Sequence, residues 1–253
     1  MKIQLKNIGK SFQLQKDKQL KVLENINLDI EEGDFLILLG ESGCGKSTLL
    51  NLMAGLTSPT SGEIYSDKGP ITSPHPSRIL LFQHPSLLPW LNVEENIAFG
   101  CKLRGDKDNL AERTRHYIEL MGLTGMEKIH PPQLSVGMAH RVALARALIG
   151  SPDVLLLDEP FRSLDTMNSM RLLDELISLW KRGDFTAVFV THNIEEAILL
   201  GNKIVLLGGK PTGIREIFTV PLDYPRDMAA DSFMKTRATI FLKAKEAYGG
   251  KRA

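Results

Sequence analysis

A glycine-rich segment early in the chain, residues 40–47, reads Gly-Glu-Ser-Gly-Cys-Gly-Lys-Ser. Its spacing of Gly, four residues and Gly-Lys-Ser is typical of a phosphate-binding loop. A short apolar run precedes it and a segment with one apolar face follows it, which predicts a strand, the loop and a helix in that order. A glycine-rich turn that binds nothing is the alternative. With both flanks correct, the pattern favours an α/β fold with a nucleoside triphosphate site.

Each residue type in this loop has a chemical role. Glycines adopt backbone angles that other residues avoid, so successive N–H groups can turn towards an anion. The start of the following helix adds N–H donors and the positive end of its dipole. We expect Lys46 to reach the β- and γ-phosphates and the Ser47 hydroxyl to ligate Mg²⁺. The residues predicted to bind the nucleotide here are Gly40, Glu41, Ser42, Gly43, Cys44, Gly45, Lys46, Ser47 and Thr48.

Length and charge narrow the class of protein. The 253 residues suffice for one large α/β domain, and the net charge of +1 without a block of like charges predicts no nucleic-acid partner. Two cysteines, Cys44 and Cys101, suggest no disulfide framework and fit a reducing compartment. The first residues lack the apolar stretch of a signal peptide, and no run approaches the roughly 18 apolar residues of a membrane span. We therefore expect a cytoplasmic protein that does not itself cross a membrane.

The pattern of apolar residues predicts the order of strands and helices. Strands are expected over residues 3–8, 22–30, 34–39, 61–65 and 78–82, and helical pattern over 48–54, 93–123 with an interruption near Gly105, and 136–149. Strand and helix then alternate: strands over 154–157, 187–190 and 203–207, helices over 167–181 and 194–200, and helical pattern after residue 221. This alternation favours a largely parallel sheet with helices on its faces.

A second cluster of polar residues ends a buried strand. Four apolar residues, 154–157, lead into Asp158 and Glu159. Asp158 is placed to hold Mg²⁺, through water, and Glu159 to polarise the water that attacks the γ-phosphate. A solvated Asp-Glu pair leading into a turn is the alternative, which the presence of Lys46 and Ser47 makes less favourable.

Six motifs or single residues occur along the chain in a fixed order: the phosphate loop, Gln83, residues 134–138, residues 155–160, residues 163–165 and His192. With them the chain resembles, over nearly its whole length, the ATP-binding subunit of an ABC transporter. Residues 86–93 (Ser-Leu-Leu-Pro-Trp-Leu-Asn-Val) with Glu-Asn-Ile at 95–97, and the later segments 210–214 and 220–222, resemble importer subunits of the nitrate/sulfonate/taurine group.

The resemblance implies roles for four more residues. Gln83 contacts Mg²⁺ and the attacking water, and it couples the site to the helices that follow; a polar residue at a strand end is the alternative. His192 contacts the γ-phosphate and orients the water and Glu159, although a lone His is more often structural. Phe12 stacks on adenine, with a buried core Phe as the alternative. Asp165 is placed among the nucleotide-binding residues by the same resemblance.

The resemblance also implies a head-to-tail homodimer. Ser135 and Gly137 would supply a hydroxyl and a backbone N–H to the γ-phosphate bound by the opposite subunit. ATP bridging both halves closes the dimer and hydrolysis reopens it. The family usually has Leu-Ser-Gly-Gly-Gln here, whereas this chain has Val136 and Met138; His140 and Arg162 also depart from the usual pattern. These departures bear on the efficiency of hydrolysis more than on its existence.

The fold implied is α/β, a P-loop NTPase core (ABC ATPase) with an N-terminal antiparallel β-subdomain and an inserted helical subdomain. We expect an ATPase domain over residues 1–220, with the helical subdomain at about 85–150, and a helical tail over 221–253. The part from about 85 to 132 would pass motion to an integral-membrane permease. Trp90, Leu88 and Leu91 either line that docking groove or pack the core of the subdomain.

The implied function is an ATP-hydrolysing subunit that energises an importer, using ATP and Mg²⁺ at the cytoplasmic face of the cell membrane. The solute would be a small anion or organic solute of the nitrate, sulfonate or taurine type, delivered through a solute-binding protein. Two other classes stay open: a soluble ABC ATPase that acts on ribosomes or DNA, and a nucleotide-binding partner with weak catalysis, suggested by Val136 and Met138. We also expect Cys44 to be alkylated in the free protein and protected by ATP.

Overall fold

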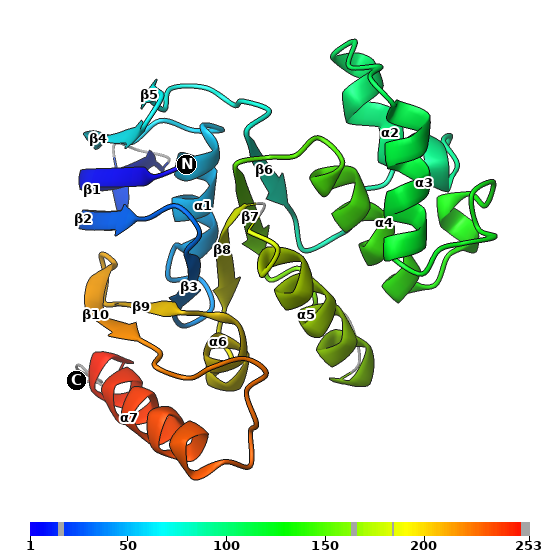
Figure 1. Ribbon diagram of the computed structural model, residues 1–253. Coiled ribbons are helices and arrows are strands. Elements are labelled where there is room, and N and C mark those ends of the chain that lie inside the picture. Colours follow the sequence, from blue (N-terminus) through cyan, green and yellow to red (C-terminus); the bar gives the residue numbers. More distant parts are fainter. Residues whose placement is uncertain (15–17, 163–165, 184, 249–253) are drawn as a thin grey trace. The chain divides into compact units, whose positions relative to one another are not determined.

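The computed structural model describes residues 1–14, 18–162, 166–183 and 185–248, and the chain divides into two compact units (Figure 1). The first unit combines Met1–His75 with Thr186–Ala253, and the second is Pro76–Phe185. Each unit contains both strands and helices, as the alternating pattern predicts. None of the helices in the described ranges is both long and apolar enough to span a bilayer.

An antiparallel sheet forms the N-terminal part of the first unit. Its strands are β1 (Ile3–Gln13), β2 (Gln19–Ile30), β4 (Ser61–Ser66) and β5 (Gly69–Pro70), in the order β2-β1-β4-β5. The predicted antiparallel β-subdomain is thus confirmed. β1 runs beyond the predicted end at Ile8, because register shifts on both sides of this residue interrupt the period-two alternation there.

A mostly parallel sheet forms the rest of the first unit. Its strands are β3 (Phe35–Leu39), β8 (Thr186–Thr191), β9 (Lys203–Gly208) and β10 (Gly213–Thr219). β3 is fully buried and pairs in parallel with β8 and β9, while β10 pairs antiparallel with β9. The sequence pattern did not predict β10, because its partly exposed residues form no continuous apolar run.

Three helices accompany this sheet. α1 (Lys46–Ala54) follows β3, α6 (Ile194–Leu200) joins β8 to β9, and α7 (Asp231–Tyr248) packs against α6 and β9 (Figure 1). α7 begins ten residues later than the helical pattern after Pro221 suggested. The buried side chains of Phe233, Ile240 and Ala244 hold it in place.

The second unit places helices around a pair of parallel strands, β6 (Arg78–Leu81) and β7 (Val154–Asp158). Its helices are α2 (Val93–Leu103), α3 (Leu110–Leu120), α4 (Val136–Leu148) and α5 (Thr166–Trp180), with a 3-10 turn at Pro131–Gln133. α2 packs against both α3 and α4. The predicted interruption near Gly105 is confirmed, because this glycine has a φ of 74° just after α2 ends.

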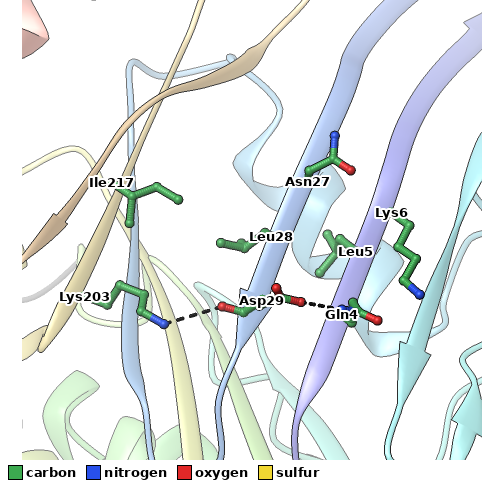
Figure 2. A pocket seen from close by; sticks show the side chains of 8 residues that line it. All are labelled: Gln4, Leu5, Lys6, Asn27, Leu28, Asp29, Lys203 and Ile217. Carbon is green, nitrogen blue, oxygen red and sulfur yellow. Dashed lines mark hydrogen bonds between the residues drawn. The ribbon is translucent and has the colours of Figure 1, made fainter.

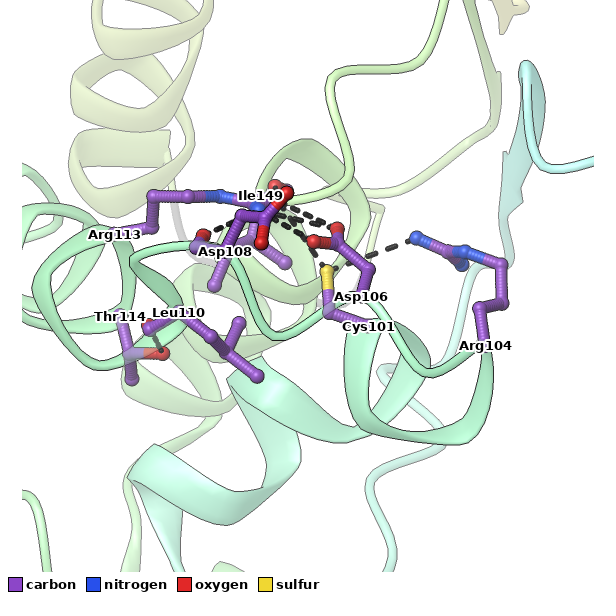
Figure 3. A network of polar contacts seen from close by, with 8 residues as sticks. All are labelled: Cys101, Arg104, Asp106, Asp108, Leu110, Arg113, Thr114 and Ile149. Carbon is purple, nitrogen blue, oxygen red and sulfur yellow. Dashed lines mark hydrogen bonds and ion pairs between the residues drawn. The ribbon is translucent and has the colours of Figure 1, made fainter.

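A polar network centred on Arg113 connects α3 to α2 and to the end of α4 (Figure 3). From α3 its guanidinium donates to both carboxylate oxygens of Asp106, at 3.0 and 3.1 Å, and to the Cys101 sulfur at 3.5 Å. It also donates to the Ile149 carbonyl at the end of α4, where a cation favours the negative end of the helix. The hydrogen bond from Arg113 lowers the pKa of Asp106. The network thereby fixes α4, the helix that begins at the predicted signature residues.

Candidate functional site

Residues 40–47 form the connection between β3 and α1, as predicted. Gly43 has a φ of 77° and Gly45 a φ of 99°, both in the left-handed region that residues with side chains avoid. The Cys44 N–H donates to the Glu41 carbonyl over 3.3 Å and closes a turn inside the loop. The backbone itself therefore requires glycine at these two positions.

Neighbouring strands explain the first and last glycines of the motif. A Cβ atom on Gly40 would lie 2.8 Å from the Cys44 sulfur and 3.1 Å from the Leu207 carbonyl oxygen. A Cβ atom on Gly45 would lie 2.8 Å from Cγ1 of Val22. The loop is thus pressed against β9 at one end and β2 at the other, so a larger residue at either glycine would displace it.

The start of α1 differs from the starts of two other helices, α2 and α6. Asn92 caps α2 and Asn193 caps α6 through their side chains, and each of those helices has two glutamates in its first turn. α1 starts at Gly45 with no side-chain cap hydrogen bond and no acidic residue in its first turn. Ser47 is exposed at the second position of the helix. The positive end of the α1 dipole is therefore not offset by local carboxylates, which suits a bound phosphate.

Lys46 is held inside the loop and is only 4% exposed. Its ammonium donates to the carbonyl oxygens of Gly40 at 2.7 Å and Glu41 at 2.8 Å. Burying a charged group costs several kcal/mol unless hydrogen bonds compensate, and these two bonds supply part of that compensation. The ammonium is thus already positioned within the loop that is predicted to surround the phosphates.

Cys44 is half-buried beside Gly40, and burial raises the pKa of its thiol, with the charge of Lys46 acting in the opposite direction. Alkylating reagents react with the thiolate. We therefore expect the alkylation predicted from the sequence to be slow in the folded protein.

Two further predicted residues lie in the first unit. Phe12, near the end of β1, is 41% exposed, so the alternative of a buried core Phe is wrong. The Lys10 ammonium lies 5.1 Å from its ring centroid. His192 is exposed directly after β8, and the Thr191 hydroxyl accepts a hydrogen bond from the Asn193 N–H at 3.0 Å. The backbone around His192 is thereby fixed, while the roles of Phe12 and His192 remain predictions.

The second unit carries the two carboxylates. Asp158 is the last residue of β7 and is half-buried. Glu159, the next residue, has a φ of 43°, a backbone strain that costs roughly 1–3 kcal/mol outside glycine. Its carboxylate pairs with the Arg162 guanidinium at 3.0 Å, and its side chain is 12% exposed. The residue that departs from the family pattern, Arg162, therefore restrains the predicted catalytic carboxylate.

Replacing Arg162 with Ala should raise the rate of ATP hydrolysis, because Glu159 loses a partner that competes for its carboxylate. A partly exposed pair is worth roughly 0.2–1 kcal/mol, and 1.36 kcal/mol corresponds to about tenfold in rate, so we expect an increase in kcat of up to about fivefold. Steady-state phosphate release measures it, with Arg162→Lys as a control that keeps the charge. A fall in kcat would instead mean that Arg162 assists Glu159.

Gln83 is half-buried, two residues after β6. The segment that follows it is tied to α4 by Arg146, which donates to the carbonyls of Pro85 at 2.9 Å and Ser86 at 3.1 Å. Sequence reasoning missed Arg146. Its contacts support the predicted coupling between Gln83 and the helices, because a shift of α4 would pull on this segment.

The signature residues lie where α4 begins. Ser135 caps the helix, its hydroxyl accepting from the Met138 N–H at 3.2 Å. Val136 is 54% exposed, and a Cβ atom on Gly137 would meet no atom of the described residues within 4 Å. The start of α4 is therefore an open helix N-terminus within its unit, with the side chain of Val136 directed outward.

A buried asparagine shapes the segment around Trp90. Asn96 is 0% exposed; its side-chain amide donates to the carbonyls of Leu88 at 3.1 Å and Leu91 at 2.9 Å, and its oxygen accepts from the Leu88 N–H at 2.9 Å. Trp90 is 70% exposed, so it does not pack the core of the subdomain. Sequence reasoning did not assign Asn96 this role; a polar residue three positions after buried Val93 is the signal that could have revealed it.

The predicted site residues are thus divided between the units. The first unit brings together residues 40–48 and also contains Phe12 and His192, and the second contains Gln83, Ser135, Gly137, Asp158 and Glu159. Asp165 lies outside the described residues. The predicted metal ligands offer a hydroxyl (Ser47), an amide (Gln83) and a carboxylate (Asp158), oxygen donors that suit Mg²⁺.

A separate cavity of about 370 Å³ lies between β1 and β2 on one side and β9 and β10 on the other (Figure 2). The Gln4 amide donates to the Asp29 carboxylate at 2.8 Å, and the Lys203 ammonium donates to the Asp29 carbonyl oxygen at 3.5 Å. None of the predicted site residues lines it. Its polar side chains join neighbouring strands, so this cavity is not the predicted nucleotide site.

Known proteins resemble this chain closely. A family model described as "ABC transporter" matches residues 23–162. The aliphatic sulfonates import ATP-binding protein SsuB of Bacillus cereus is 42% identical over 250 residues, covering 99% of this chain and 98% of the relative. The nitrate import ATP-binding protein NrtD of Synechococcus elongatus is 41% identical over 227 residues, covering 88% and 82%.

Solved structures extend the likeness to the fold. The dimeric structure of MJ0796, a bacterial ABC transporter cassette, has a TM-score of 0.76 and 30% identity, covering 87% of this chain and 100% of that chain. A dimeric post-hydrolysis state of the ATP-binding cassette MJ0796, bound to ADP and Pi, has a TM-score of 0.75 and 29% identity, with the same coverage.

Proposed function

Because this chain belongs to the ABC transporter family, we propose that it is the subunit of an importer that binds and hydrolyses ATP to energise solute uptake. The observation that carries the proposal is the phosphate loop itself, with Lys46 already held inside it and α1 starting without a side-chain cap. The likeness to import ATP-binding proteins over nearly the full chain supports the same function.

In this function the loop amides and Lys46 bind the phosphates, and Phe12 stacks on the base. Ser47, Gln83 and Asp158 would hold Mg²⁺, which neutralises charge on the phosphate oxygens when bound. Glu159 takes a proton from the attacking water, while Gln83 and His192 orient that water. Asp165 contributes to the nucleotide site.

The proposed assembly is a head-to-tail homodimer. The open start of α4, with Ser135 and Gly137, would meet the γ-phosphate held by the partner subunit. The solved structures of similar fold are themselves dimeric. Val136, exposed at the same helix start, would lie in this interface and alter its strength.

A composite site predicts that the rate of hydrolysis per chain rises with protein concentration. At low concentration, where the chain is monomeric, the rate should approach zero, since each site lacks its partner half. Phosphate release measured across a dilution series, beside the fraction of dimer from analytical ultracentrifugation, tests this. A rate per chain that is independent of concentration, with the chain monomeric throughout, would contradict the dimeric mechanism.

We further propose the division into an ATPase domain over residues 1–220, with a helical subdomain at about 85–150, and a tail over 221–253. The helical subdomain would dock on an integral-membrane permease at the cytoplasmic face of the membrane, and a solute-binding protein would deliver the solute. Trp90 is suited to this docking, because Asn96 holds its segment while its own side chain is 70% exposed.

Replacing Trp90 with Ala should therefore uncouple transport from hydrolysis. The isolated chain should keep its ATPase rate, because Trp90 is exposed and is not among the residues predicted to bind or hydrolyse ATP. Co-purification with the permease and solute uptake should fall about tenfold or more, as for aromatic anchors of interfaces. The exposed Leu103 of α2, changed to Ala, is the matched control. Undiminished co-purification would place the docking surface elsewhere.

The solute class is proposed as a small anion or organic solute of the sulfonate, nitrate or taurine type, by analogy with the relatives. Uptake of labelled taurine, an alkanesulfonate and nitrate by cells with and without this gene would identify it. Equal uptake of all three in both strains would reject this solute class.

A further inference from the structure

The turn that carries His192 is built onto the first residues of α6. The Thr191 hydroxyl donates to the Glu196 carboxylate at 2.5 Å and accepts from the Asn193 N–H at 3.0 Å. The Asn193 side chain in turn accepts from the N–H groups of Glu195 at 2.8 Å and Glu196 at 3.2 Å. His192 lies between these two bonded neighbours. The position of its backbone therefore follows the position of α6.

α6 is too short to hold a fixed position by itself. It has seven residues, Ile194–Leu200, whereas isolated helices below roughly 12–15 residues are marginal in water. The buried side chains of Ala197, Ile198 and Leu200 hold one face of the helix against the sheet. The last carbonyl groups of a helix, however, have no partner inside it. Groups from elsewhere in the chain, or water, have to satisfy them.

The segment between β10 and α7 passes α6 and supplies such groups (Figure 1). The Arg226 guanidinium donates to the carbonyl oxygens of Ile198 and, at 2.7 Å, of Gly201. The Tyr224 hydroxyl donates to the Leu200 carbonyl. The guanidinium also lies 4.0 Å from the centroid of the Tyr224 ring, a distance at which cation and ring attract. A cation is thus held at the carboxyl end of α6, where the helix dipole favours it.

Arg237 of α7 holds the opposite end of α6. Its guanidinium pairs with the Glu195 carboxylate at 2.5 Å, in the first turn of the helix. The helix that carries Arg237 is itself anchored by Phe233 and Ile240, each 1% exposed. The residue after Glu195 is Glu196, which accepts the hydrogen bond from the turn before the helix. Contacts from the C-terminal part of the chain therefore reach both ends of the helix that supports His192.

We propose that Tyr224, Arg226 and Arg237 form a clamp on α6 and act as positioning residues, because they hold the turn of residues 191–193 where His192 orients the attacking water. The consequence for hydrolysis rests on the proposed function, whereas the clamp itself does not. A misplacement of about 1 Å near reacting groups can cost about 100-fold in rate, so loss of the clamp lowers turnover. ATP binding is kept, because the phosphate loop is held by separate contacts with β9 and β2.

The first measurement is hydrogen exchange of the full chain, read by mass spectrometry on peptides that cover residues 190–200. For Arg226→Ala we expect about tenfold faster exchange, because two hydrogen bonds from a charged group are lost and α6 opens more often. Arg237→Ala removes a partly exposed ion pair and should accelerate exchange about threefold. Tyr224→Phe, which keeps the ring and deletes one hydrogen bond, should also give about threefold.

Lys243→Ala is the matched control, because its ammonium pairs at 3.2 Å with Glu246 on α7 itself. Exchange over residues 190–200 should stay at the wild-type rate in this variant. Wild-type exchange in Arg226→Ala would overturn the clamp, and so would an equal acceleration in Lys243→Ala.

The second measurement compares turnover in two backgrounds. For Arg226→Ala, kcat should fall about tenfold while the Kd for ATP is unchanged. In a His192→Ala background the same change should lower kcat no further, because a positioning residue acts only through the residue that it positions. A further tenfold fall in that background would overturn the proposed route through His192. If His192→Ala alone leaves kcat unchanged, the proposed role of His192 fails, while the exchange rates still decide whether the clamp holds α6.

Discussion

Replacing Glu159 with Gln is expected to abolish ATP turnover and to trap the chain as an ATP-bound dimer. The carboxylate stands at the end of β7 on a strained backbone, with a φ of 43° and a side chain that is 12% exposed. An amide of the same shape cannot accept the proton of the attacking water, and a general base contributes roughly 10²–10⁴-fold to rate. Since the change touches no predicted phosphate contact, ATP should still bind.

Three measurements together test the role of Glu159: phosphate release, nucleotide retained after gel filtration, and the mass of the complex. We expect kcat to fall at least about 100-fold, with ATP retained in a species of twice the chain mass. Glu112→Gln, a matched change at an exposed residue of α3, should behave as wild type. Turnover within a factor of about three of wild type would overturn the catalytic role of Glu159.

Replacing Lys46 with Ala should weaken ATP binding strongly, and should not merely slow turnover of bound ATP. Lys46 is 4% exposed, and its ammonium already donates to the Gly40 and Glu41 carbonyls within the loop that is predicted to surround the phosphates. Each hydrogen bond to a charged group is worth about 1.5–3 kcal/mol, and loss of the phosphate contacts should therefore raise the Kd for ATP by about 100-fold.

Calorimetric titration with MgATP measures this change. Lys2→Ala, which removes an ammonium paired with Glu31 at 2.8 Å elsewhere in the same unit, is the control and should leave the Kd unchanged. An unaltered Kd in Lys46→Ala would show that the loop does not hold the phosphates through this residue. The two variants are distinguishable, because Glu159→Gln keeps ATP and Lys46→Ala does not.

Most elements of the fold could be predicted because their signals are local. Buried strands such as β3 and β7 are continuous apolar runs, and the break after α2 is marked by Gly105. The edge strand β10 was missed because exposed and buried residues mix along it. The late start of α7 was missed because the residues after Pro221 share its composition without being helical.

Buried polar side chains were harder to predict, because their partners are distant in sequence. Asn96 and Arg146 look like ordinary residues of amphipathic helices, yet they hold the segment that follows Gln83 through its carbonyl groups. Only the packing of α4 beside that segment explains why the charged Arg146 is found on this side of the helix. The exposure of Trp90 likewise depends on the turn that Asn96 maintains.

By itself the sequence determined the chemistry of the phosphate loop, because its donors and its cation stand within eight consecutive residues and need only a strand before and a helix after them. Only the tertiary structure showed that a side chain at Gly40 would crowd the Leu207 backbone and that Arg162 restrains Glu159. The physical reason is distance along the chain: a local motif specifies which groups are present, whereas packing between remote segments decides how firmly they are held.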